Sequence, residues 1–313
     1  MARLKSLGRH WSLPVIVGVA VALVGLALKS ACAPWSWGGS AETYSRLCYS
    51  DLGPLYWLRG MADGVIPYFQ SYDGQYIEYP VLTGMWMWLI AIVTHAMVGG
   101  QSVGTFVALT WATSVVFIAG TLALMARNST GNRHASWWFA LSPALLLTLG
   151  INWDALAVMC AVGALIMYQR GKMTAAGLLI GVGAAAKLFP ALLLVPIVAN
   201  ALGRRNLKDA IRVSLVAAGT WIAINLPFFV FARDGWWEFY RFSRERGIDF
   251  GSLPLALSYL FNLNITTSQA NTFGLVAVAA ASLVILVMNK KLSVYQSSFI
   301  IVAVFVLANK VYS

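Results

Sequence analysis

Ten apolar runs, separated by short polar segments, make up most of the chain. They lie at 11–28, 81–97, 103–125, 136–149, 156–168, 174–186, 191–202, 211–231, 271–288 and 293–308. A chain of 313 residues with 59% hydrophobic residues cannot bury that much apolar surface in one soluble core, so its solvent must be lipid. We therefore predict an all-α, polytopic membrane protein that forms a single domain over residues 1–313.

The basic residues predict how the chain is oriented in the membrane. They form four clusters between apolar runs, and the cytoplasmic segments of membrane proteins are rich in Lys and Arg. All four clusters fall on the cytoplasmic side only if the run 81–97 does not cross. We therefore predict about nine spans, a cytoplasmic N-terminus and a juxtamembrane helix over 81–97 on the outer side. The clusters are Arg127/Arg133, Arg170/Lys172, Arg204/Arg205/Lys208/Arg212 and Lys290/Lys291.

The same pattern accounts for the formal net charge of +11. Because the basic residues lie between apolar runs, we expect membrane lipids as neighbours and no nucleic-acid partner. With this topology, ten of the eleven acidic residues lie on the outer side and only Asp209 lies inside. The unusual polar groups therefore gather on one face of the membrane.

The first apolar run has two interpretations. Arg3, Lys5 and Arg9 precede it, which is typical of both a signal anchor and a cleaved signal peptide. Ala31-Cys32-Ala33 resembles a cleavage site. We favour the uncleaved anchor, because the later spans need a first helix that orients them.

The three cysteines differ in their surroundings. Cys32 and Cys48 lie in the polar segment 30–80, where they form either a disulfide in an oxidising compartment or two free thiols. Cys160 lies inside an apolar run and is expected to pack there. No Cys/His cluster has the spacing of metal ligands, so we predict no metal site and no cofactor.

The segment 30–80 is the first candidate for chemistry. It is a long predicted outer loop rich in Gly and aromatic residues, and such loops usually exist to bind or react. Its tyrosines, Tyr79 among them, either take part in binding or form an ordinary interfacial belt. The segment holds five of the eleven acidic residues, which are Glu42, Asp51, Asp63, Asp73 and Glu78.

Four further polar groups interrupt the apolar runs on the predicted outer side. An ionisable residue at membrane depth tends to mark a site. Each group also has a purely structural alternative: Lys187 could reach the outer headgroups, Asp154 could cap the next helix, and the arginines could contact lipid. The groups are Asn152-Trp-Asp154, Lys187-Leu-Phe-Pro190, the second outer loop 232–264 with Arg241, Arg244 and Arg246, and Lys310.

These motifs together resemble the GT-C superfamily of membrane glycosyltransferases. More closely, they are similar to the actinobacterial polyprenyl-phosphate-mannose-dependent mannosyltransferases that build phosphatidylinositol mannosides and lipomannan. The resemblance covers the whole chain in order. It rests on Tyr49-Ser-Asp51-Leu, Gly64-Val-Ile-Pro67-Tyr, Glu78-Tyr-Pro80-Val-Leu, Asn152-Trp-Asp154, Ala186-Lys-Leu-Phe-Pro190 and Asn309-Lys-Val-Tyr-Ser313.

The resemblance implies a GT-C-like bundle with juxtamembrane helices in the first outer loop. It also implies an inverting transfer from a lipid-linked sugar, with Asp51 as the general base. Many GT-C enzymes carry paired acids at this position, whereas Asp51 is flanked by Ser50 and Leu52, which argues against a metal. The family's last motif usually continues into further helices, so we expect a chain that is shortened at its C-terminus.

We therefore predict a hexosyltransferase in the plasma membrane of a bacterium, in particular an actinobacterium. A hexose, in particular mannose, passes from a polyprenyl-phosphate donor to a hydroxyl of a glycolipid or lipoglycan at the outer face. Lys187 and Arg246, with Arg244 behind them, suit the phosphate. The predicted substrate-binding residues are Asp73, Glu78, Tyr79, Asp154, Lys187, Arg244, Arg246 and Lys310.

Other functions fit parts of the pattern. A lipid-linked sugar flippase or other transporter would place ionisable residues in mid-membrane and often has repeated halves, whereas here the charges lie on one face and no repeat is visible. A noncatalytic scaffold would not need the outer carboxylates. An arabinofuranosyltransferase is an alternative within the same class.

Overall fold

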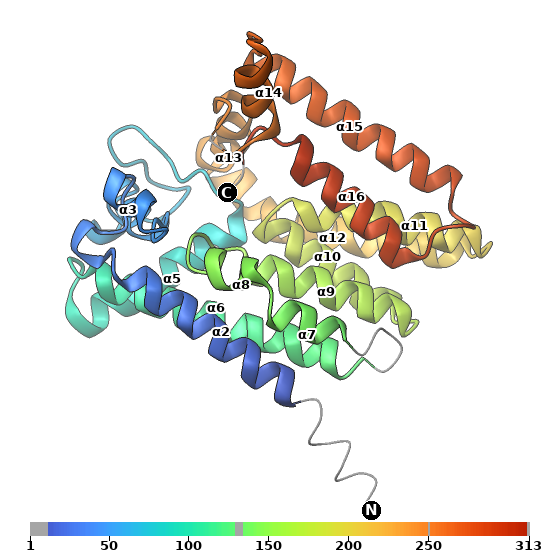
Figure 1. The fold of residues 1–313 in the computed structure, drawn as a ribbon, viewed down its shortest axis with the longest axis horizontal. Helices are drawn as coiled ribbons and strands as arrows, with labels where there is room; N and C mark the ends of the chain where they lie inside the picture. The colour runs from blue at the N-terminus through green and yellow to red at the C-terminus, as the bar shows by residue number, and fades with distance from the viewer. Residues whose placement is uncertain (1–11, 129–133, 250, 312–313) are drawn as a thin grey trace, which may run out of the picture.

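A computed structural model describes residues 12–128, 134–249 and 251–311 as helices joined by loops. The N-terminal basic residues, Arg133 and Ser313 lie outside these ranges. Among the described residues the one extended pairing is an isolated bridge between Tyr72 and Gln75, so the all-α prediction is confirmed. The elements, with the labels of Figure 1, are α2 (Ser12–Ser30), η1 (Ala33–Trp35), α3 (Ala41–Ser45), α4 (Leu52–Leu58), η2 (Met61–Asp63), α5 (Val81–Val98), α6 (Val103–Ala126), α7 (Ala135–Ala140), α8 (Pro143–Thr148), α9 (Ala155–Gln169), α10 (Met173–Ala186), η3 (Phe189–Leu193), α11 (Leu194–Gly203), α12 (Leu207–Phe231), α13 (Arg233–Glu245), α14 (Leu253–Phe261), α15 (Thr267–Val287) and α16 (Val294–Ala308).

The helices form one continuous bundle (Figure 1). α2 packs against α6, α7 and α8, and the bundle continues from α6 through α9 and α10 to α12, with α11, α15 and α16 beyond. Five described helices, α2, α5, α6, α12 and α15, are long and apolar enough to span a membrane. This confirms a polytopic membrane protein. The other apolar helices are shorter, and even where two of them follow one another directly the apolar stretch has no more than 17 residues, below the roughly 20 that a straight span needs.

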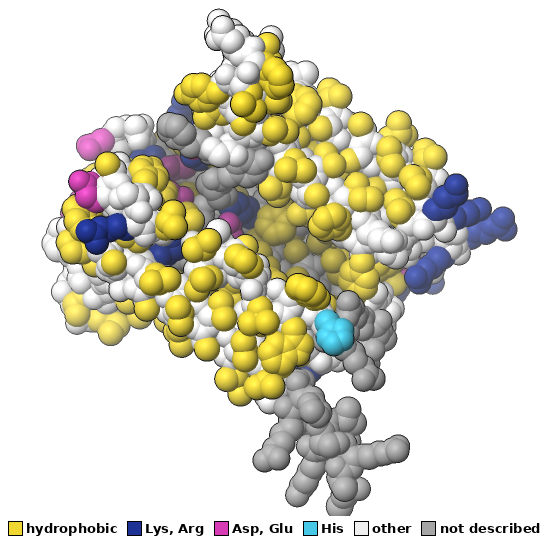
Figure 2. Space-filling model, in the orientation of Figure 1, with side chains coloured by type: hydrophobic (Ala, Val, Ile, Leu, Met, Phe, Trp, Pro, Cys, Tyr) yellow, Lys and Arg dark blue, Asp and Glu magenta, His cyan; other side chains and the backbone are white. Residues whose placement is uncertain are grey.

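The two ends of the bundle carry different charges (Figure 2): acidic and basic side chains lie together at one end, and a cluster of Lys and Arg lies at the other. Acidic side chains gather at the end that carries the 30–80 segment. A cluster of Lys and Arg marks the opposite end, near the links between α11 and α12 and between α15 and α16. This cluster lies at the two links that carry the predicted clusters Arg204/Arg205/Lys208/Arg212 and Lys290/Lys291.

The run 136–149 is not the single span that the sequence suggests. It forms two short helices, α7 and α8, with a break at Leu141 and Ser142. The cause is Pro143, which has no N–H and disfavours helical backbone in the preceding residue. The Ser142 side chain caps α8 by accepting from the Ala144 N–H at 3.2 Å.

Small residues allow α10 to lie directly against α12. A Cβ atom added to Gly177 would lie 2.8 Å from the Val213 carbonyl oxygen, and one added to Gly181 would lie 2.6 Å from that of Ala217. These positions have no room for a side chain. The close packing predicted from the spacing of Gly177 and Gly181 is therefore confirmed.

Both ends of α5 contact residues that belong to one end of the bundle. Near its start, the Thr83 hydroxyl donates to the Ala186 carbonyl at the end of α10, at 2.7 Å. Near its end, His95 Nε2 lies 2.9 Å from the carbonyl oxygen of Met61 in the 30–80 segment. An 18-residue helix is about 27 Å long. It therefore starts and finishes among residues that the sequence places on the outer side.

The second predicted outer loop, 232–264, contains two helices rather than irregular chain. α13 is amphipathic: most of its charged residues lie on one face of the helix and most of its aromatic residues lie on the other. The Trp236 indole N–H donates to Asn225 of α12 at 2.9 Å. This bond holds the start of α13 against the helix that precedes it.

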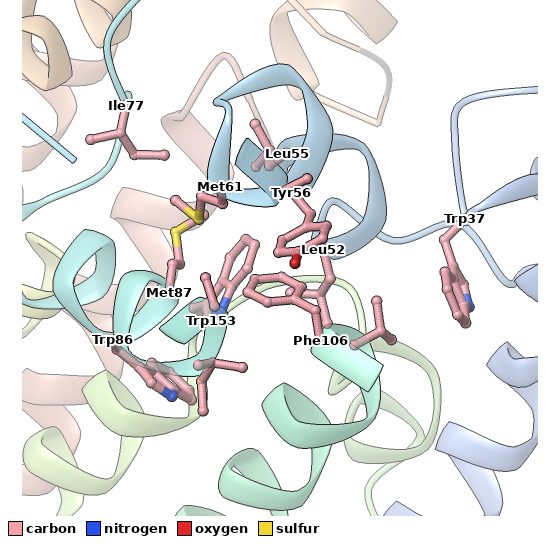
Figure 3. Packing of buried hydrophobic residues seen from close by; sticks show 14 of the residues in the cluster. Trp37, Leu52, Leu55, Tyr56, Met61, Ile77, Trp86, Met87, Phe106 and Trp153 are labelled. Atoms are coloured by element: carbon pink, nitrogen blue, oxygen red, sulfur yellow. The ribbon is translucent and has the colours of Figure 1, made fainter. Parts of the chain in front are cut away.

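The 30–80 segment packs over an apolar core that it shares with α5, α6 and the loop before α9 (Figure 3). Tyr56 and Met61 from this segment surround Trp153 together with Met87 of α5 and Phe106 of α6. The rings of Tyr56 and Phe106 stack with centroids 4.3 Å apart. A polar loop would cost conformational entropy to order, and this buried apolar cluster offsets that cost.

A disulfide between Cys32 and Cys48 closes the first part of the segment. Both cysteines are fully buried. Of the two alternatives that the sequence left open, the structure contains the bonded form. Buried Lys29 also holds this part of the segment, because its ammonium donates a hydrogen bond to the Tyr49 carbonyl at 3.3 Å.

Candidate active site

Asp51 lies where the 30–80 segment meets the loop before α9. Its backbone N–H donates to the Ile151 carbonyl at 2.9 Å. The neighbouring Ser50 hydroxyl donates to the Gly150 carbonyl at 2.6 Å. Two contacts between segments that are about a hundred residues apart in sequence therefore fix the position of Asp51.

The Asp51 carboxylate accepts two hydrogen bonds. The Tyr49 hydroxyl donates to Oδ1 at 2.5 Å, and the Asn152 amide donates to Oδ2 at 3.3 Å. Asn152 is itself oriented by Tyr79, whose hydroxyl donates to the amide oxygen at 3.1 Å. Predicted site residues Asp51 and Tyr79 therefore belong to one polar network, which Asn152 connects.

Lys187 and Asp154 form an ion pair beside this network. Asp154 immediately precedes α9, and Lys187 immediately follows α10, where the chain turns to an extended conformation. The following Pro190 prevents a simple continuation of α10. The Asp154 side chain makes no capping bond to α9, so the capping alternative for Asp154 is wrong.

The loop after α13 meets the chain just beyond α16. Arg246 pairs with Asp249 at 2.7 Å between Nη2 and Oδ2. The Asp249 N–H donates to the Lys310 carbonyl at 2.9 Å, and the buried Lys310 ammonium donates to the Arg244 carbonyl at 3.0 Å. Burial lowers the pKa of Lys310, and the nearby charge of Arg246 lowers it further. Arg246 and Lys310 therefore belong to one basic unit.

The electrostatic surroundings of Asp51 link the network, the ion pair and the basic unit. Burial raises the pKa of the Asp51 carboxyl above its ordinary value. The hydrogen bond from Tyr49 and the positive charges of Arg246 and Lys187 oppose this rise, and the negative charge of Asp154 adds to it. Such influences act over short distances. Hydrogen bonds and the ion pair therefore bring the segments of Asp51, Asn152–Asp154 and Lys187 together, and the positive charge of Arg246 acts on the same carboxyl.

Three predicted site residues have different surroundings. Both Glu78 carboxylate oxygens accept from Arg59, at 2.6 and 2.9 Å, and only 12% of the Arg59 and 9% of the Glu78 side chain is exposed. Asp73 is exposed in a tight turn with a φ of 48°. The Arg244 residue is exposed, and its carbonyl binds Lys310. The structure does not bring Glu78 and Asp73 into contact with Asp51.

Three residues of the site were absent from the predicted set, namely Tyr49, Asn152 and Asp249. Tyr49 and Asn152 stand in the same short motifs as Asp51 and Asp154, and both are able to donate to a carboxylate. Asp249 follows Arg246 by three residues, a spacing that permits ion pairs. Position within a motif was the available signal for Tyr49 and Asn152, and charge spacing was the signal for Asp249.

A hollow opens on the face shown in Figure 2, between α8 and α16. Its floor is hydrophobic, and acidic and basic side chains lie at its edge. Within the described ranges no group of three or more His, Cys, Asp or Glu residues could hold a metal ion. The groups that the described part of the site offers to a substrate are carboxylates, cations and an apolar surface.

This arrangement suits proton transfer beside an anion. A partly buried carboxylate with a raised pKa, such as that of Asp51, is a stronger base than one in water, once it is ionised. Lys187 and Arg246 supply positive charge that would stabilise negative charge that develops nearby. A base and two cations in one region meet the requirements for attack by a hydroxyl with departure of a phosphate.

Comparison with known proteins identifies one family. The model of glycosyltransferase family 87 matches residues 76–308, about three quarters of the chain. The matched region contains Tyr79, Asp154, Lys187 and Arg246, and it begins after Asp51. Searches of curated proteins and of solved structures gave no match.

Proposed function

The chain belongs to glycosyltransferase family 87, and from this membership we propose that it is a polyprenyl-phosphate-dependent mannosyltransferase. The acceptor is a hydroxyl of a glycolipid or lipoglycan at the outer face of an actinobacterial plasma membrane. The observation that carries the proposal is the partly buried Asp51 carboxylate, which binds Tyr49 and Asn152 beside the ion pair of Asp154 and Lys187.

In the proposed step Asp51 removes the proton of the acceptor hydroxyl. The oxygen attacks the anomeric carbon of the donor sugar, and the bond between that carbon and the phosphate oxygen breaks. The lipid phosphate leaves with the bonding electron pair, and the configuration at the anomeric carbon inverts. Because the phosphate is already a good leaving group, the base and the electrostatic stabilisation supply most of the catalysis.

Lys187 and Arg246 are the proposed ligands of the phosphate. Each is paired with a carboxylate of the chain, Asp154 and Asp249 respectively. Both pairs are partly exposed, so a phosphate can compete for the cations at moderate cost. Arg is suited to bidentate contact with phosphate oxygens. The hydrophobic hollow beside α8 and α16 (Figure 2) offers apolar surface for a polyprenyl chain.

Placement of this site on the outer face has three lines of support. The 30–80 segment contains a disulfide, which is typical of an oxidising compartment. A cluster of Lys and Arg side chains lies at the opposite end of the bundle, near the α11–α12 and α15–α16 links (Figure 2). Both ends of α5 contact the same end as Asp51, which fits a juxtamembrane helix and a cytoplasmic N-terminus.

The proposal is tested with the purified chain in lipid nanodiscs. Incubation with radiolabelled polyprenyl-phosphate mannose and phosphatidylinositol mannoside should give a labelled, inverted glycolipid. Parallel incubation with decaprenyl-phosphate arabinofuranose should give none. Movement of intact donor across a vesicle membrane without product would indicate a transporter instead. Labelled product from the arabinose donor alone would assign the other sugar.

A further inference from the structure

A second cleft lies beside the start of α13, outside the polar region around Asp51. It has a volume of about 430 Å³ and opens between α13 and the tip of the 30–80 segment. Gly235 of α13 packs directly on the Tyr68 backbone, where an added Cβ would lie 2.1 Å from the carbonyl oxygen. The side chains that give the cleft its chemistry are Tyr76, Arg233, Asp234, Trp237, Glu238 and Arg241.

The charges of this cleft balance. Two arginines face two carboxylates, and Arg241 binds Glu238 through Nε and Nη2 at 2.7–3.0 Å. Glu238 is buried, whereas 54% of the Arg241 side chain is exposed. A phosphate would need an excess of positive charge. The cleft instead offers fixed donors and acceptors to an uncharged ligand with many hydroxyl groups.

Trp237 gives the cleft a flat apolar surface among these polar groups. The residue is 56% exposed, although Trp is usually well buried. Its ring lies close to Tyr240, with centroids 5.5 Å apart, which limits its movement. A pyranose ring has an apolar C–H face and a rim of hydroxyls, so it can lie on an indole while its hydroxyls bond to charged neighbours.

α13 also connects this cleft with the proposed catalytic region. Arg241 lies within α13, and Arg246 is the residue that directly follows the helix. The charge of Arg246 acts on Asp51. The cleft therefore lies on the helix whose last turn leads directly into Arg246.

We propose that the cleft beside Tyr76 and Trp237 binds the non-reacting sugar units of an oligosaccharide acceptor. This inference rests on the proposed function for the identity of the acceptor. Trp237 stacks on one sugar ring, and the Arg241–Glu238 pair bonds to its hydroxyls. The cleft thereby selects acceptors that already carry several sugars, while Asp51 acts on the hydroxyl of the terminal unit.

Binding of a soluble probe tests the cleft without any need for catalysis. We expect α-linked mannotriose to bind the full chain in nanodiscs by saturation-transfer NMR, and inositol phosphate not to bind at this cleft. Trp237→Ala should weaken mannotriose binding about tenfold or more, and Trp237→Phe should restore part of it. Trp138→Ala is the matched control, because Trp138 is a 77% exposed tryptophan on α7.

Transfer assays with two acceptors complete the test. With an acceptor that has several mannose units, Trp237→Ala should raise the acceptor KM about tenfold. With an acceptor that has one mannose unit, and for the donor KM, it should change nothing. Equal losses for both acceptors, or unchanged mannotriose binding, would overturn the proposal. Mannotriose binding that depends on Trp237, without any transfer, would support the sugar-binding cleft and contradict the proposed mannosyltransferase activity. Transfer that is unaffected by Trp237→Ala would support the activity and contradict the sugar-binding cleft.

Discussion

Substitution of Lys187 by Met separates a phosphate ligand from a structural ion pair. Met keeps most of the side-chain length and removes the ammonium. Loss of a charge-assisted hydrogen bond costs about 1.5–3 kcal/mol, so kcat/KM for the donor should fall about 10- to 150-fold. The pair with Asp154 has side chains that are 29% and 42% exposed, and such a pair contributes about 1 kcal/mol or less to stability. We therefore expect Tm to fall by no more than about 4 °C.

The assay is donor kinetics at saturating acceptor, with thermal unfolding in the same nanodiscs. Lys187→Met/Asp154→Asn removes the carboxylate that the single variant leaves unpaired, so it should recover stability and keep the low kcat/KM. Lys208→Met is the matched control, since Lys208 is exposed at the opposite end of the bundle. Normal donor kinetics in the double variant would show that Lys187 only neutralises Asp154, and would refute its role at the phosphate.

Three further predictions concern pH, the disulfide and the topology. A pH profile of kcat/KM should fall as pH is lowered through the raised pKa of Asp51, because only the ionised carboxylate accepts a proton; a flat acidic limb would contradict this. Replacement of Cys32 and Cys48 by Ala opens a loop of 16 residues and should cost about 3 kcal/mol, measured as a lower Tm and lost transfer; an unchanged Tm would contradict it. An impermeant maleimide on intact cells should label Cys introduced at Asp73 and leave Cys introduced at Arg205 unlabelled; the reverse pattern would invert the proposed topology.

Much of the helical architecture could be predicted from hydrophobic runs alone. α5, α6, α9 and α10 begin and end within a residue or two of the runs that predict them. These runs succeed because in lipid a backbone must satisfy its hydrogen bonds internally. The break before Pro143 was not predicted, although the sequence contains its signal, since Pro ends a helix by a local mechanism.

α13 could not be recognised from apolar content, because charged residues occupy a large part of it. Its signal lies instead in the spacing of opposite charges. Glu238, Arg241 and Glu245 follow one another at three and four residues and form i,i+3 and i,i+4 ion pairs, which stabilise helices. A search for charge spacing would have predicted this helix.

The candidate site was predictable as a list of residues and not as a set of contacts. Asp51 and Asn152 meet across 101 positions of sequence, and no local rule pairs them. For Glu78, too, the sequence did not predict the residue that it contacts. Its partner Arg59 lies 19 residues earlier, and their pairing depends on how the 30–80 segment folds over the apolar core that it shares with α5 and α6.

The rate of sugar transfer by Asp51→Asn tests the central claim most directly. Asn cannot accept a proton, so the single-turnover rate should fall about 10²–10⁴-fold, while Glu42→Gln, an exposed acid in the same segment, should react normally. Because burial raises the pKa of Asp51, the folded state loses stability as pH rises through that pKa, and the neutral variant should unfold at no lower temperature at pH 7. A folded Asp51→Asn protein that transfers mannose at nearly the native rate would contradict the account.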